Sequence, residues 1–194
     1  MKVPKPEFTR QLPPIGNHVA RVINVIYLGT QHSDKYGDAY KMRLTWELPN
    51  EKMVLKEGET EKPFVVSKET SLSMGQKSTL RPIVEGILGV ALTDDEAYNF
   101  DLDQLVGMSC MLYITHEEGE TVTYAKVNTA TPLPKGLVCP PPFNELKILS
   151  FEKWDEEFFQ KLPQFIREKI TSSKEYKKMN GEIVEDVSAD DVPF

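Results

Sequence analysis

Basic and aromatic side chains recur along strand-like segments of this 194-residue sequence. In the stretch 40–48, "YKMRLTWEL", Lys41 and Arg43 alternate with apolar residues, so they point away from the apolar face. Cations and aromatic rings on one face suit single-stranded nucleic acid, because phosphates need positive charge and each stacked base contributes about 1–3 kcal/mol. The DNA-binding candidates are Lys35, Tyr36, Lys41, Arg43, Phe64, Lys68, Lys77, Arg81, Tyr124 and Lys126.

The same residue types have a second interpretation. Lysines on an exposed strand also discourage pairing between sheet edges, and charge alone does not separate the two roles. Among the aromatic residues, Tyr36, Phe64 and Tyr124 are candidates for stacking on bases. Trp46 shares the inward phase of its strand, which predicts a core position.

Catalytic constellations are not apparent. The three histidines lie far apart, and no phosphate-binding glycine motif is present. A two-metal nuclease could be imagined from Asp94, Asp95, Glu96, Asp101 and Asp103, but helix N-termini favour acids at such positions anyway. We therefore expect no enzyme, no cofactor and no metal. The two cysteines, separated by 29 residues, predict neither a zinc site nor a disulfide scaffold, and favour a reducing cytoplasm.

The elements that must position these residues follow a recognisable order. Three strand patterns precede a helix within 78–89, and two further strand patterns follow it. The order β-β-β-α-β-β predicts a mainly β fold, a five-stranded OB-fold barrel. Small SH3-like barrels and α+β sheets give similar patterns. The five strand segments are 18–29, 40–48, 64–73, 108–117 and 121–133.

Composition divides the chain into four parts. Residues 1–16, with four prolines, predict an extended arm before the core at 17–133. Residues 134–171 combine a proline-rich linker with an apolar helical stretch, 154–170, which we expect to pack on the barrel or on a second subunit in a homodimer. Residues 172–194 are polar and acidic, which predicts a flexible tail.

Charge is concentrated at the C-terminal end. The net charge is −7, of which residues 1–149 contribute 16 − 19 = −3 and residues 150–194 contribute 7 − 11 = −4. An acidic protein is usually not a ligand of duplex DNA, although a local basic groove can override the average. Neither a signal peptide nor a run of about 20 apolar residues is present, so we expect a soluble protein that is not exported.

The sequence ends in "SADDVPF" (188–194), where a terminal phenylalanine follows acidic residues. A loose end has no means of burying such a ring, which suggests that a partner protein does. The last 13 residues contain five acids and no base, and these acids would steer the ring towards a basic rim.

This ending resembles the acidic tip of bacterial single-stranded DNA-binding proteins. The segments "VARVINVIYLGTQ", "YKMRLTWELP", "PFVVSKETSLS", "STLRPIVEGILG" and "LPQFIREKITSSKEY" are similar, in that order, to the phage-encoded members of the class. The resemblance implies a non-catalytic protein that coats single-stranded DNA in replication, recombination or repair. It also implies that the tip binds partner proteins of those processes through Asp190, Asp191, Val192, Pro193 and Phe194.

One departure from that class is the presence of only two adjacent aspartates, preceded by Ala189, which predicts weaker or different partners. The alternative function is a β-barrel protein-interaction module that does not bind DNA. In that case the cations along the strands would only be solvated.

Overall fold

The computed structural model describes residues 11–53 and 60–182 of the chain. Most of the expected N-terminal arm and the proposed tip at 190–194 lie outside these residues. Among the described residues, no helix is long and apolar enough to cross a membrane.

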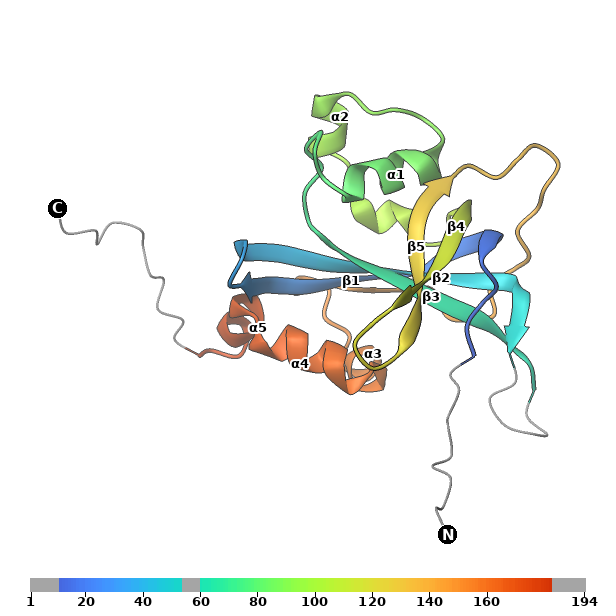
Figure 1. Ribbon diagram of the computed structural model, residues 1–194. Helices are drawn as coiled ribbons and strands as arrows, with labels where there is room; N and C mark the ends of the chain where they lie inside the picture. Colours follow the sequence, from blue (N-terminus) through green and yellow to red (C-terminus); the bar gives the residue numbers. More distant parts are fainter. Residues whose placement is uncertain (1–10, 54–59, 183–194) are drawn as a thin grey trace, which may run out of the picture.

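A six-stranded sheet forms the centre of the protein (Figure 1). Its strands lie in the order β3-β2-β1-β4-β5 and are antiparallel, while β6 joins β1 in a parallel pair. Helix α1 (Leu80–Leu88) falls between β3 and β4, so the expected order of elements is confirmed for the core. The strands are β1 (Gly16–Ser33), β2 (Gly37–Met53), β3 (Lys62–Ser71), β4 (Ser109–Glu118), β5 (Thr123–Thr131) and β6 (Lys147–Leu149).

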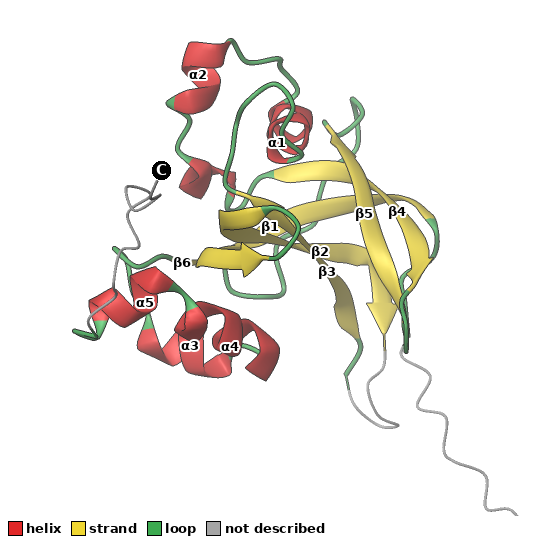
Figure 2. Cartoon of the chain, turned by 60° about the vertical axis from the view of Figure 1, so that its left-hand side comes forward, coloured by secondary structure: helices red, strands yellow, loops and turns green. Residues whose placement is uncertain are grey.

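The prediction of a closed barrel is wrong, because the sheet stays open between β3 and β5 (Figure 2). These strands lie in contact, but no backbone ladder joins them within the described part of the chain. Instead Lys68 of β3 donates a hydrogen bond of 2.7 Å from Nζ to the carbonyl oxygen of Val127 in β5. A side-chain hydrogen bond therefore joins the two strands at this point.

The first hydrophobic core lies on the inner side of the curved sheet, under α1. Met42, Leu44, Trp46 and Leu48 of β2 are fully buried there, which confirms the predicted alternation and the core position of Trp46. Helix α1 adds apolar side chains to this core and packs so tightly on β5 that a Cβ at Gly86 would lie 1.9 Å from the carbonyl oxygen of Ala130.

The helices between β3 and β4 have defined ends. Gly89 ends α1 in the left-handed region at φ 73°, where glycine carries no Cβ penalty. Thr93 and Glu96 form a reciprocal capping box at α2 (Asp94–Tyr98). Asp101 caps the short 3₁₀ helix η1 (Leu102–Leu105) by accepting a hydrogen bond from the N–H of Asp103.

The C-terminal helices form a second layer on the outer side of β1. These are α3 (Glu156–Lys161), α4 (Gln164–Ser172) and α5 (Lys174–Met179). Their apolar side chains form a second core with two residues of β1 and one of β6. The members of this second core are Ile26, Leu28, Leu149, Phe159, Leu162, Ile166 and Ile170.

Two expectations about the C-terminal part change as a result. The apolar stretch 154–170 packs within its own chain, so it no longer supports a homodimer. The flexible tail does not begin at Ser172, because α5 continues the helical layer and Glu175 fixes it to β1. Its carboxylate accepts hydrogen bonds from the Thr30 N–H (2.8 Å) and the Thr30 hydroxyl (2.6 Å).

Candidate nucleic-acid interface

The candidate interface is the outer face of β2 and β3, which we call the outer β2–β3 face. Antiparallel register pairs Lys41 with Ser71, Arg43 with Glu69, Thr45 with Ser67, and Glu47 with Val65. Because paired residues share a face, these eight side chains point away from the first core. They define the outer β2–β3 face used below.

Its cations are held by specific partners. Glu69 contacts two of them, at 2.9 Å from Arg43 and 2.6 Å from Lys169 of α4. The Arg43 guanidinium also lies 5.6 Å from the centre of the Phe165 ring, a cation–π arrangement. Lys41 donates from Nζ to the Ser71 hydroxyl at 2.9 Å. The cations are therefore positioned, with Glu69 as a shared counterion.

A second group of predicted residues lies on the outer side of β5. Lys126 forms an ion pair of 2.8 Å with Glu117 of β4. The hydrogen bond that Lys126 donates to Glu117 raises the pKa of Lys126. A hydrogen bond from the Tyr124 hydroxyl to Glu117 raises the pKa of Tyr124. Tyr124 keeps a partly exposed ring, as expected of a stacking candidate.

Lys68 does not join either group. It pairs with Leu44 in the register and so lies on the inner side of β3, opposite Lys41 and Arg43. Burial and the nearby charge of Lys126 lower its pKa, and its ammonium is bound to the carbonyl of Val127. Lys68 therefore links β3 to β5 and lies apart from Lys41 and Arg43, and its role as a phosphate ligand stays a prediction.

Two further DNA-binding candidates, Phe64 and Arg81, are buried. Phe64 is only 8% exposed and belongs to the first core, because it shares the inward phase of Val66. Arg81 is 9% exposed and forms ion pairs with Glu85 (2.9 Å) and Asp94 (2.6 Å). Its guanidinium also donates to the carbonyls of Met74 and Leu92. Arg81 therefore connects α1 to the segments before and after it, and its guanidinium is occupied by these contacts.

The remaining predicted residues are exposed but lie at the periphery. Lys35 and Tyr36 occupy the turn between β1 and β2, where the lysine Nζ lies 5.1 Å from the centre of the tyrosine ring. The Tyr36 residue is 77% exposed. Lys77 is exposed just before α1.

Two exposed phenylalanines border the outer β2–β3 face, and sequence reasoning missed both. Phe165 of α4 lies against Arg43 and is 50% exposed, while Phe143 of the linker lies beside Glu47 and is 56% exposed. Arg43 and Glu47 are four residues apart on β2, or about 13 Å along an extended strand. Exposed aromatic rings of this kind can serve as platforms for bases.

The linker that carries Phe143 is fixed by buried polar groups. The fully buried Glu47 carboxylate accepts hydrogen bonds from the N–H groups of Phe143 (2.9 Å) and Asn144 (2.8 Å), and from Asn144 Nδ2 (2.6 Å). Its neighbour across the strand pair, Arg21, donates to the carbonyls of Gly107, Cys139 and Pro140. In the sequence, the only signal for the fixed linker was a single acid, Glu47, and a single arginine, Arg21, within two predicted strands.

Three of the acids considered for a nuclease, Asp94, Glu96 and Asp103, have structural partners, and Asp101 caps η1. Asp94 binds Arg81, Glu96 completes the capping box, and Asp103 accepts from the Tyr27 hydroxyl (3.0 Å) and pairs with Lys153 (2.7 Å). Across the described ranges, no group of three or more His, Cys, Asp or Glu side chains could hold a metal ion.

Comparisons with known proteins add no further assignment. The chain matches no known protein family, and no curated protein matches it either.

Proposed function

We propose that this protein is a non-catalytic single-stranded DNA-binding protein whose open sheet is of the OB type. The strand order β3-β2-β1-β4-β5, with β3 lying against β5 and α1 between β3 and β4, supports this proposal. In OB folds the face of strands 2 and 3 is the one that binds oligonucleotides. The observation that carries the proposal is the presence there of positioned cations bordered by two exposed phenylalanines.

Binding would combine two kinds of contact. Phosphates would pair with Arg43, Lys169 and Lys41, while bases would stack on Phe165 and Phe143. Phosphate contacts carry no sequence information, so binding would not depend strongly on sequence. Tyr124 and Lys126 would extend the path onto β5, since β3 and β5 lie in contact.

Partner recruitment through the tip is the second half of the proposal. The tip lies outside the described residues, so this half rests on the sequence alone: acids that steer and a terminal ring that inserts into an apolar pocket. The acidic tail would also compete with DNA for the cations Lys41, Arg43 and Lys169 of its own chain.

Fluorescence anisotropy with labelled oligo-dT and a matched duplex, at several NaCl concentrations, tests the DNA half. We expect preference for the single strand and weakening with salt. Changing both Phe143→Ala and Phe165→Ala should weaken binding at least about thirtyfold, because each lost stack costs about 1–3 kcal/mol and the two together cost about 2 kcal/mol or more. The matched control is Tyr98→Ala, an exposed ring on α2, which should change affinity less than twofold. Absence of single-strand binding at low salt refutes the proposal.

Removal of residues 183–194 tests the tail. The shortened chain should bind oligo-dT more tightly at low salt, and a tail with the same residues in scrambled order should restore the weaker binding. Capture of a purified partner should require the native order. An unchanged affinity in the shortened chain contradicts competition by the tail.

A protein-interaction module without DNA binding is the alternative. Two acids favour this alternative because they already neutralise part of the positive charge. Glu69 pairs with Arg43 and Lys169, and Glu117 pairs with Lys126. The oligo-dT titration separates the two functions.

A further inference from the structure

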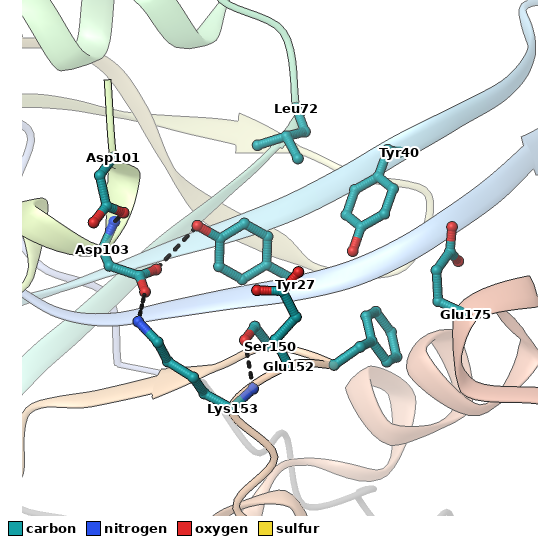
Figure 3. A pocket seen from close by; sticks show the side chains of 10 residues that line it. Tyr27, Tyr40, Leu72, Asp101, Asp103, Ser150, Glu152, Lys153 and Glu175 are labelled. Atoms are coloured by element: carbon teal, nitrogen blue, oxygen red, sulfur yellow. Dashed lines mark hydrogen bonds and ion pairs between the residues drawn. The ribbon is translucent and has the colours of Figure 1, made fainter. Parts of the chain in front are cut away.

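A pocket of about 630 Å³ opens between the sheet and the C-terminal layer (Figure 3). Its walls come from β1, β2, the residues after β3, η1, the loop 150–153 and α5. Pockets of this size commonly take small ligands or single side chains. The lining residues are Tyr27, Tyr40, Leu72, Asp101, Asp103, Ser150, Phe151, Glu152, Lys153 and Glu175.

The charges of this lining are strongly unbalanced. Four carboxylates face one ammonium group, which gives −4 + 1 = −3. Lys153 pairs with Asp103, and Glu175 accepts from Thr30, so these three charged groups already have partners. Asp101 and Glu152 add negative charge that Lys153 does not balance. Such a pocket repels phosphate, so it is not a continuation of the nucleic-acid interface.

Aromatic rings form the other part of the lining. Tyr27 and Tyr40 lie side by side in the pocket, and the Tyr40 hydroxyl points into it (Figure 3). Tyr27 donates its hydroxyl proton to Asp103 at 3.0 Å, which fixes that ring. Burial, together with the charges of Glu175 and Glu152, raises the pKa of Tyr40 to about 12. Both tyrosines therefore stay neutral at physiological pH and keep electron-rich faces.

We propose that this pocket binds an organic cation, an alkylammonium or guanidinium group. Aromatic faces attract cations, and surrounding carboxylates add charge-assisted hydrogen bonds. The pocket offers both kinds of group around one cavity, and its net charge selects against anions. The inference does not depend on DNA binding. A protein side chain and a free polyamine share this chemistry, so the test includes both.

The test measures binding to the full chain by isothermal titration calorimetry with two probes. One is the capped pentapeptide Gly-Gly-Arg-Gly-Gly, compared with the same peptide containing citrulline, and the other is spermidine. The test variant carries Asp101→Asn and Glu152→Gln, and asparagine retains the capping ability of Asp101 at η1. The matched control carries Asp95→Asn and Glu120→Gln, two exposed acids outside the pocket.

At least one cationic probe should bind, and the citrulline peptide should not. Each neutralised carboxylate about 6 Å from the cation should weaken binding roughly threefold in a water-like dielectric, so the double variant should lose about tenfold. The control should change affinity less than twofold. A stronger signal with the peptide assigns the pocket to a protein side chain, and a stronger signal with spermidine assigns it to a free polyamine. The proposal is overturned if neither probe binds, or if the pocket variant binds as well as the control.

Discussion

Glu69 lies between two cations of the outer β2–β3 face, so its removal gives a direct test of that face. Its oxygens are 2.9 Å from Arg43 and 2.6 Å from Lys169. A DNA phosphate that binds Lys169 must replace this carboxylate. Glu69→Gln keeps the shape of the side chain but removes the competing charge and replaces one of its two acceptor oxygens with an amide donor.

The size of the effect follows from elementary electrostatics. A negative charge about 6 Å from a phosphate costs about 0.7 kcal/mol in a water-like dielectric, so its removal should tighten oligo-dT binding about threefold. One additional phosphate contact should also steepen the slope of log K against log salt by about 0.7 for a single strand. The three side chains remain partly accessible to solvent, so the loss of stability should be at most about 1 kcal/mol.

The assay is an anisotropy titration of oligo-dT from 50 to 200 mM NaCl, with the melting temperature measured in parallel. Asp95→Asn is the control, because it removes the same charge from the exposed surface of α2. A folded Glu69→Gln protein with the affinity and salt slope of the wild type would mean that DNA does not use this face.

Three further predictions concern stability. Gly86→Ala should lower the free energy of unfolding, measured by urea titration, by about 1–3 kcal/mol or more. The new Cβ would lie 1.9 Å from the carbonyl oxygen of Ala130, and this clash outweighs the higher helix propensity of alanine. The control Gly75→Ala should be nearly neutral, because its Cβ would lie 3.4 Å from the nearest atom, the Tyr98 hydroxyl oxygen. Phe159→Ala should lower the free energy of unfolding by about 3–5 kcal/mol, because the ring is buried beside Trp154 and Tyr176. Phe143 is exposed, so Phe143→Ala should lower it far less. The Glu85 carboxylate accepts hydrogen bonds from the Leu92 N–H and from Arg81, and the Asp94 carboxylate accepts one from Arg81, which lowers the pKa of both acids. Their contribution to stability is therefore present above their ordinary pKa values of 4.5 and 3.8 and is lost as pH falls through the lowered values. Melting temperatures between pH 6 and pH 3 should therefore fall less steeply in the double variant Glu85→Gln, Asp94→Asn than in the wild type.

Local sequence patterns predicted the elements whose signals lie within a few residues. The alternation in 40–48 placed Trp46 in the core, and the fully buried Trp46 confirms it. The side of β3 that faces the core was harder to predict from the sequence, because the start of the strand, Phe64-Val65-Val66, is apolar on both faces. Phe64 and Lys68 both lie on the inner phase of β3, where they pair with Leu48 and Leu44 of β2.

Long-range contacts were the part that the sequence did not reveal. Arg81 looked like an exposed cation because its partner Asp94 is 13 residues away in a different element. Glu47 has the outward phase of the stretch 40–48, yet it is buried under Phe143 and Asn144 of the linker. These two residues follow Glu47 by 96 and 97 positions in the sequence. Such pairs depend on how the chain folds back, which periodicity cannot report.

The C-terminal layer changes how the sheet could hold a ligand. By covering the outer side of β1, it confines the accessible path to β2, β3 and β5, and it supplies Phe165 and Lys169 to the border of that path. Residues from the helical layer and from the sheet thus meet at Glu69. A ligand that displaces this carboxylate would also break the ion pair between α4 and β3. We therefore expect DNA binding to alter hydrogen exchange in α4 as well as in the sheet, whereas binding confined to the β1–β2 turn would leave α4 unchanged.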